Sequence, residues 1–270
     1  MKRALLIALV YFLFLCVSAY PAGMIQGVML GSNACTPSSD SCTGGLTFSW
    51  HCETANVTTG GACGGSHNVN NGCSAGATTA TANGGATLSS TQAEDGTYSV
   101  YVGGGNENYS FSVTDGTEIS NTAGTFDIFV YVTSFVSTGG FVDYYASSSD
   151  YIDVQMYTNT NNQFRLGYMA AGTGKFAITA ISGGFSTGAW YHISAEWSRT
   201  AQSGNYLKIC ADTVANCPIG SFCTNNCGTG TTALTTWTGA SGTLYVGDKF
   251  GVAGHDYIDV LKIYSTWGGF

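Results

Sequence analysis

The strongest constraint on this chain is a repeating pattern of short β-prone runs separated by turns rich in glycine, serine and asparagine. From Leu46 onward, no stretch carries the 3.6-residue apolar period of a helix. The clearest β-prone runs cover residues 125–132, 141–145, 151–157, 163–168, 175–181 and 190–197. Many short strands with frequent turns are typical of antiparallel sandwiches and barrels. The sequence therefore predicts an all-β fold in one domain.

Composition excludes several other classes of protein. Only 9% of the residues are charged, against roughly 25% in an ordinary soluble domain. Aromatic residues make up 13%, and this much ring surface drives collapse and excludes disorder. Three prolines, with no glycine at every third position, exclude collagen. Eight lysines and arginines against sixteen acids argue against a nucleic-acid partner, because neutralising phosphates needs clustered cations.

The amino terminus is typical of a secretory signal peptide. Lys2 and Arg3 form a basic start, an apolar run covers residues 4–17, and residues 17–19 supply a cleavage site. The alternative is a transmembrane anchor, but the run is shorter than the roughly 20 residues that a spanning helix needs. The sequence thus predicts a signal peptide over 1–19 and a secreted, extracellular protein, with the cell surface or the periplasm as alternative locations.

The remainder of the chain has the organisation of a single domain. Residues 20–45 form a leader rich in glycine and serine, and the β-prone pattern covers 46–267. Two loop-rich zones near 52–73 and 210–227 interrupt this pattern and hold most of the cysteines.

Nine cysteines remain after removal of Cys16 with the signal peptide. They predict disulfide bonds, because the alternative, a zinc site, favours C-x2-C pairs that the late spacings lack. The four late cysteines lie within 18 residues, so we expect them to pair among themselves, and the odd total leaves one cysteine over. The disulfide candidates are Cys35, Cys42, Cys52, Cys63, Cys73, Cys210, Cys217, Cys223 and Cys227.

Several segments, in order along the chain, resemble strands of the concanavalin A-like lectin and glucanase superfamily, above all its laminin-G-like branch. They are residues 95–100, residues 188–193 (GAWYHI), residues 206–210, residues 242–247 and the closing strand 257–264 (YIDVLKIY). The resemblance implies an antiparallel two-sheet sandwich of the jelly-roll type. It implies little about function, because this fold hosts lectins, adhesins, hydrolases and lyases.

The catalytic motifs of enzymes with this fold are missing. The glucanases carry carboxylates at alternate positions on one strand, and no two of the sixteen acids here are two positions apart. The lyases use a Gln-x-His strand, whereas Gln155 is followed by Met156 and Tyr157. A Ser/His/Asp triad is not favoured, because the four histidines come without a nucleophile-elbow sequence. The sequence therefore favours a protein without catalytic activity.

The alternation of apolar and polar residues along the strands indicates one candidate ligand-binding surface. In residues 151–157, 163–168 and 190–197, apolar residues alternate with polar residues that should face outward. If these strands share a sheet, its outer face suits sugar recognition, because amides and carboxylates bond hydroxyls while rings cover C–H faces. The alternative is an ordinary solvated face. The candidate ligand-binding residues are Asp153, Gln155, Tyr157, Arg165, His192 and Glu196.

The resemblance also implies a structural calcium ion. In the resembling folds, an aspartate of the closing strand often holds Ca²⁺ together with main-chain carbonyls and an acid near the first strand. Asp259 matches the first position and Glu53 the second, and such hard oxygen ligands suit Ca²⁺. The alternative is a carboxylate of Asp259 that caps loop amides. No other cofactor is expected.

Three functions are compatible with these observations. The first is a secreted, non-catalytic β-sandwich that binds carbohydrate or another surface ligand. The second is a structural or assembly protein of an extracellular surface or filament, which implies self-assembly. A polysaccharide-active enzyme is the third. After signal cleavage, no transmembrane segment is expected.

Overall fold

The computed structural model describes residues 45–50, 81–96, 98–136, 139–158, 162–237, 239–249 and 256–268, all within the compact unit Cys35–Phe270. The predicted signal peptide and nearly all of the leader lie outside these residues. So do Glu53 and the early cysteines, namely Cys35, Cys42, Cys52, Cys63 and Cys73. The described ranges contain no helix that could cross a membrane.

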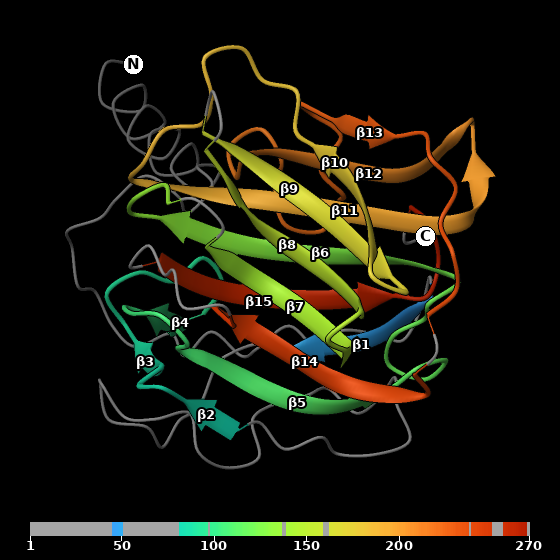
Figure 1. The fold of residues 1–270 in the computed structure, drawn as a ribbon. Coiled ribbons are helices and arrows are strands. Elements are labelled where there is room, and N and C mark those ends of the chain that lie inside the picture. Colours follow the sequence, from blue (N-terminus) through green and yellow to red (C-terminus); the bar gives the residue numbers. More distant parts are fainter. Residues whose placement is uncertain are drawn as a thin grey trace, which may run out of the picture. The chain divides into compact units, whose positions relative to one another are not determined.

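The described residues form two antiparallel sheets, so the all-β two-sheet sandwich is confirmed (Figure 1). The first sheet has the order β13 (Gly228–Gly230), β12 (Asn205–Thr213), β11 (Ala189–Gln202), β6 (Ala123–Val132), β15 (Asp256–Tyr264), β4 (Ser99–Val102) and β3 (Thr87–Ser89), and β1 (Leu46–Trp50) also pairs with β15. The second sheet has the order β10 (Thr173–Ile178), β9 (Gln163–Ala170), β8 (Asp150–Tyr157), β7 (Gly140–Ser147), β14 (Ser241–Gly247), β5 (Asn108–Thr114) and β2 (Thr81–Asn83).

The core lies between the two sheets and is built largely from aromatic rings. Phe48 and Trp50 of the first sheet pack against Phe111 of the second, with ring centroids 5.4 and 5.5 Å apart. Alternation predicted the inward residues correctly, since all of the following are buried: Ile152, Val154, Met156, Phe164, Leu166, Tyr168, Tyr191, Ile193, Ala195 and Trp197. Period-two patterning therefore assigned the core-facing side of each strand correctly. Several residues on the outward side are buried as well, namely Asp153, Gln155, His192, Ser194 and Glu196.

One glycine of the first sheet is required by close packing. Gly124 lies opposite Trp197 in the pairing of β6 with β11. A Cβ atom on Gly124 would lie 2.3 Å from the Trp197 ring, which is shorter than any normal contact. The indole lies over this glycine, and its Nε1 donates to the Ser120 carbonyl over 2.8 Å. The absence of a side chain at position 124 thus makes room for the Trp197 indole.

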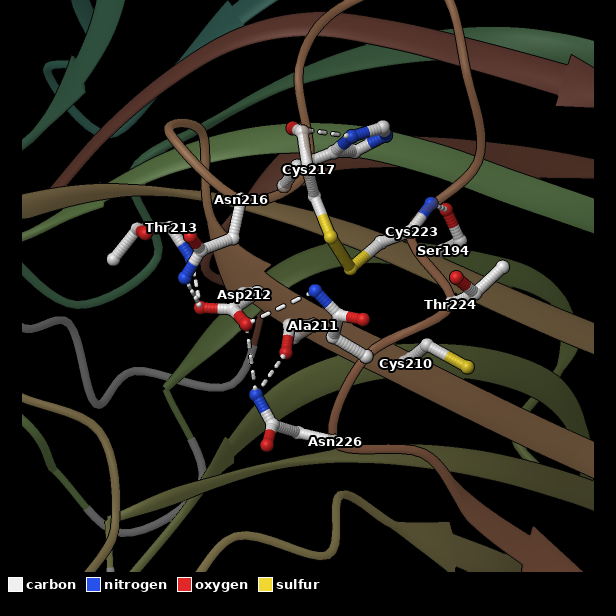
Figure 2. The surroundings of a disulfide bond; sticks show 12 residues. Ser194, Cys210, Ala211, Asp212, Thr213, Asn216, Cys217, Cys223, Thr224 and Asn226 are labelled. Carbon is white, nitrogen blue, oxygen red and sulfur yellow. Dashed lines mark hydrogen bonds between the residues drawn. A yellow bond between two sulfur atoms is a disulfide. The ribbon is translucent and has the colours of Figure 1, made fainter.

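The late cysteines form two nested disulfides, Cys210–Cys227 and Cys217–Cys223, as predicted (Figure 2). They brace residues 214–227, named the disulfide loop below. Asp212, at the end of β12, organises this loop because its carboxylate accepts side-chain amide hydrogen bonds over 3.0–3.2 Å. The donors are Asn216, Asn225 and Asn226. Covalent and polar links therefore stabilise a loop that has little apolar surface of its own.

Candidate functional site

The six predicted ligand-binding residues do not share one sheet. Asp153 and Gln155 lie on β8, Arg165 lies on β9, and both strands belong to the second sheet; Tyr157 ends β8. His192 and Glu196 lie on β11 of the first sheet. The outer faces of two packed sheets point in opposite directions, so the structure brings four of the six together and separates the other two.

His192 faces outward, as alternation predicts, but the disulfide loop covers it completely. Its exposed fraction is 0%. Its Nδ1 contacts the Cys217 carbonyl oxygen at 3.1 Å, and its Nε2 lies 2.5 Å from Asp127 Oδ1. A carbonyl oxygen only accepts, so Nδ1 is the donor in the contact with Cys217. This histidine fastens the loop to the sheet.

Ser194 completes this network without forming a catalytic triad. Its hydroxyl donates to Asp127 Oδ1 over 2.9 Å and accepts the Cys223 amide over 2.9 Å. A triad needs the serine bonded to the histidine so that the imidazole can take its proton, whereas here both side chains bond the same carboxylate oxygen. The arrangement is therefore a buried polar clamp. Glu196, also buried, pairs with Lys208 at 2.8 Å.

The outer face of the second sheet has a different character. Tyr145 and Tyr151 lie opposite each other on β7 and β8, and their rings stack with centroids 4.9 Å apart at 4°. Tyr245 of β14 meets Tyr145 edge-on at 6.4 Å. All three tyrosines are half-buried. We name the surface formed by Tyr145, Tyr151 and Tyr245 the tyrosine face.

A polar pocket of about 280 Å³ adjoins the tyrosine face and is lined by Asn83, Asn106, Asn108, Ser110, Tyr245 and Lys249. The amide of Asn83 donates to Asn108 Oδ1 over 2.8 Å and to Ser110 Oγ over 3.0 Å. Asn108 in turn donates to the Asp248 carbonyl over 3.0 Å. These bonds hold the amides in place before any ligand arrives. Tyr245 belongs to both features, so rings and pocket form one continuous surface.

Two cations lie on aromatic rings at opposite ends of this surface. The Lys249 ammonium is 4.6 Å from the centre of the Tyr245 ring. The Arg165 guanidinium is 4.7 Å from the Phe176 ring and 5.6 Å from the Tyr157 ring. Such contacts are attractive because the ring face carries partial negative charge. Arg165 and Tyr157, both predicted from the sequence, thus flank the tyrosine face.

Two buried carboxyl groups lie beneath the tyrosine face. Asp143 pairs across the strands with Asp153, and both are buried. Gln155 donates to Asp153 Oδ2 over 2.5 Å. Burial raises the pKa of Asp153 to about 6, against the opposing charge of Arg165. Burial, then the charges of Asp153 and Asp248, raise the pKa of Asp143 well above its usual value.

Sequence reasoning missed Asp143 and the pairing of Tyr145 with Tyr151. A two-residue turn joins the strands, with Ser147 opposite Asp150, but the register shifts between Tyr145 and Ser147. Counting back from the turn would therefore set Tyr145 opposite Ile152, so the turn alone does not give the pairing. The test for carboxylates two positions apart on one strand cannot detect a pair on adjacent strands.

Asp259 lies in the closing strand β15 and is buried. Its Oδ2 accepts the backbone amides of Glu94 and Asp95 over 2.7 and 2.9 Å. These contacts match the alternative to calcium binding, in which the Asp259 carboxylate caps loop amides. In the part of the chain that the structure describes, no group of three His, Cys, Asp or Glu side chains is arranged to hold a metal. Calcium at Asp259 with Glu53 stays a prediction.

The free energy of unfolding should decrease as the pH rises from about 6 to about 9. Burial raises the pKa of Asp256 to about 8, although the amides of Thr133 and Ser134 oppose this rise. The stabilisation by the protonated carboxyl is fully present below the unfolded pKa and is lost as the pH rises through about 8. We expect a loss of about 2 kcal/mol from this group, measured by urea denaturation.

The Asp256→Asn variant isolates this contribution from other carboxyls that shift in the same direction, such as Glu94, whose pKa burial raises to about 7. Asparagine keeps an oxygen for the Thr133 amide, which Asp256 accepts over 2.9 Å. The variant should therefore show a flatter pH dependence with the fold intact. An equally steep decrease in the variant would contradict the assignment to Asp256.

Comparison with known proteins supports the fold. No protein-family model matches the sequence, and no curated protein is significantly similar to it. Domain 4 of AbnA, a GH43 extracellular arabinanase from Geobacillus stearothermophilus solved in complex with arabinotriose, is similar in structure, with a TM-score of 0.53 and 15% identity over 82% of this chain and 93% of that domain.

Two toxin domains are similar to the chain as well. The botulinum neurotoxin serotype D/C VPI 5993 binding domain has a TM-score of 0.52 and 11% identity, covering 84% of this chain and 50% of that one. The serotype D binding domain has a TM-score of 0.50 and 7% identity, covering 83% and 48%. The chain spans about half the length of these two. At such identities the likeness shows a β-sandwich fold.

Proposed function

We propose that the protein is a carbohydrate-binding β-sandwich whose binding site is the tyrosine face with its adjoining pocket. The observation that carries the proposal is the continuity of half-buried tyrosine rings with the fixed amides of Asn83 and Asn108. Rings cover the C–H faces of a sugar, and amides and hydroxyls bond its hydroxyl groups. The arabinotriose bound to the similar arabinanase domain is consistent with this ligand class.

The geometry favours ligand binding over catalysis at this surface. The oxygens of Asp143, and Oδ1 of Asp153, have no appreciable solvent contact. A general acid or a nucleophile must come within hydrogen-bond reach of the scissile bond, and these atoms lie beneath the surface. The proposal therefore assigns the carboxyl groups to the support of the tyrosine face. We also propose that the chain is related to the concanavalin A-like superfamily.

We further propose an extracellular location. The two disulfides are typical of proteins from oxidising compartments. Cleavage after Ala19 would be read directly by amino-terminal sequencing of the natural protein. Retention of residues 1–19 would contradict secretion through this signal.

Replacing Tyr151 or Tyr245 with alanine is expected to weaken glycan binding about tenfold, because each substitution removes one ring of the binding surface. The measurement is a glycan array, followed by titration calorimetry with the sugars that bind. Tyr257→Ala is the matched control, since Tyr257 packs against Tyr101 and Tyr131 on the opposite sheet. It should leave the affinity unchanged.

Two results would contradict the proposal. One is a failure of the wild-type protein to bind any glycan while a sizing column shows polymers, which would favour an assembly role. The other is an equal loss of binding in the Tyr257 control, which would place the site elsewhere or indicate a general loss of structure.

A further inference from the structure

The polar pocket beside the tyrosine face combines neutral polar groups with one cation. The described residues that line it supply amides, hydroxyl groups and a single charged group, the Lys249 ammonium, and none of them is acidic. The whole chain carries sixteen acids against eight lysines and arginines. The pocket therefore has a charge opposite in sign to that of the molecule around it.

Lys249 forms no salt bridge with a carboxylate in the described part of the chain. Its ammonium lies 4.6 Å from the centre of the Tyr245 ring. An ammonium carries several N–H donors and no acceptor, and a ring face cannot engage all of them. Donors of Lys249 are thus left for a ligand in the pocket.

The backbone around Lys249 is held at the rim of the pocket. Its amide faces the Asp143 carboxyl group of β7. The preceding residue, Asp248, donates its amide to the Glu107 carbonyl over 2.9 Å and accepts the Asn108 side chain at its own carbonyl over 3.0 Å. The lysine side chain therefore starts from a point that contacts with two neighbouring strands fix.

Two nearby acids oppose an anion in the pocket, but only from beneath the surface. Asp143 and Asp248 are buried, and neither lines the pocket. Burial, as the largest cause, raises the pKa of Asp143 well above its usual value, which reduces the negative charge that this group carries near neutral pH. The charged group that a ligand meets in the pocket is therefore Lys249.

We propose that the pocket holds the acidic group of a saccharide, a carboxylate or a sulfate ester, against the Lys249 ammonium. Tyr245 belongs to both the pocket and the tyrosine face, so the sugar that carries the acidic group lies next to the rings. The inference rests on the proposed carbohydrate binding and adds the class of ligand. Hydrogen bonds between ionised groups are roughly twice as strong as neutral ones, so acidic saccharides should bind about tenfold more tightly than their neutral counterparts.

The test compares matched acidic and neutral ligands by titration calorimetry on the full chain. The probes are oligosaccharides of galacturonate and of mannuronate, each beside its methyl ester, and a sulfated galactan oligosaccharide beside its desulfated form. Raising the ionic strength from about 0.05 M to about 0.5 M should reduce the preference for the acidic member of a pair, because salt screens the attraction. Binding of the uronates or of the sulfated galactan distinguishes the two acidic groups.

Two substitutions at position 249 separate charge from shape. Lys249→Gln removes the charge and should bring the affinity ratio of acidic to neutral saccharide close to one. Lys249→Arg keeps the charge and should retain the preference. Lys175→Gln is the matched control, since it makes the same change in net charge on β10, at the far edge of the second sheet from the pocket. It should leave the ratio unchanged.

The inference is overturned, with the proposed function intact, if the wild-type protein binds neutral saccharides at least as tightly as acidic ones. Retention of the preference in Lys249→Gln, or its equal loss in Lys175→Gln, would overturn it too. Failure of the wild-type protein to bind any saccharide, acidic or neutral, would overturn the proposed function together with this inference.

Discussion

The Asp127→Ala variant is expected to lose about 3–5 kcal/mol of unfolding free energy, the range for breaking one partner of a buried ion pair. Asp127 Oδ1 is hydrogen-bonded to His192 Nε2 and accepts from the Ser194 hydroxyl. Without it, a fully buried imidazole and a buried hydroxyl lose their partner together. Urea denaturation at pH 7 measures the loss. Ser112→Ala, on the exposed side of β5, is the control and should change stability by less than about 0.5 kcal/mol.

The conservative variant distinguishes the lost hydrogen bond from the lost charge. Asp127→Asn keeps an oxygen for Ser194 but removes the negative charge that faces His192. Asp127→Asn should therefore lose less free energy of unfolding than Asp127→Ala. A loss below about 1 kcal/mol in Asp127→Ala would show that the network contributes little to stability.

Removal of the outer disulfide, by replacing both Cys210 and Cys227 with alanine, is expected to cost about 3 kcal/mol. The two cysteines are 17 positions apart, whereas Cys217 and Cys223 are 6 apart. Because a longer closed loop restricts the unfolded chain more, removal of the inner bridge should cost less, about 2 kcal/mol. Urea denaturation without reductant measures both variants. Equal stability of both variants and the wild type would contradict the prediction.

The stability losses from these two changes should be coupled, because both changes affect the disulfide loop. The Cys217 carbonyl and the Cys223 amide bond His192 and Ser194, so the disulfide loop and the Asp127 network hold each other in place. Combining Asp127→Ala with loss of the inner disulfide should cost less than the sum of the single losses. A double-mutant cycle measures this, and strict additivity would show that the loop and the network act independently.

The outer faces of the two sheets therefore differ in their accessibility to solvent. Part of the outer face of the first sheet is closed by the disulfide loop, which contacts the buried His192 and Ser194. The outer face of the second sheet keeps half-buried rings and a pocket open to solvent. The proposed ligand site belongs to the second sheet, and the expected stability losses belong to the first.

The sequence by itself determined the local features of this protein. Period-two alternation assigned Ile152, Val154 and Met156 to the core, because successive side chains of a strand point to opposite faces whatever its neighbours are. Glycine- and serine-rich turns separated the strands. Close spacing predicted that Cys210, Cys217, Cys223 and Cys227 pair among themselves, because short loops bring their ends together at little entropic cost.

Only the tertiary structure decided which outward residues meet and which remain accessible. Alternation states that Asp153 and His192 face outward, but strand order depends on contacts between distant segments, and it placed them on different sheets. Outward is also not the same as exposed, since the disulfide loop folds back over His192. Asp143 lies beside Asp153 only because β7 pairs with β8 in this register. Local periodicity carries no information about such long-range approaches, which the packing of the whole sandwich determines.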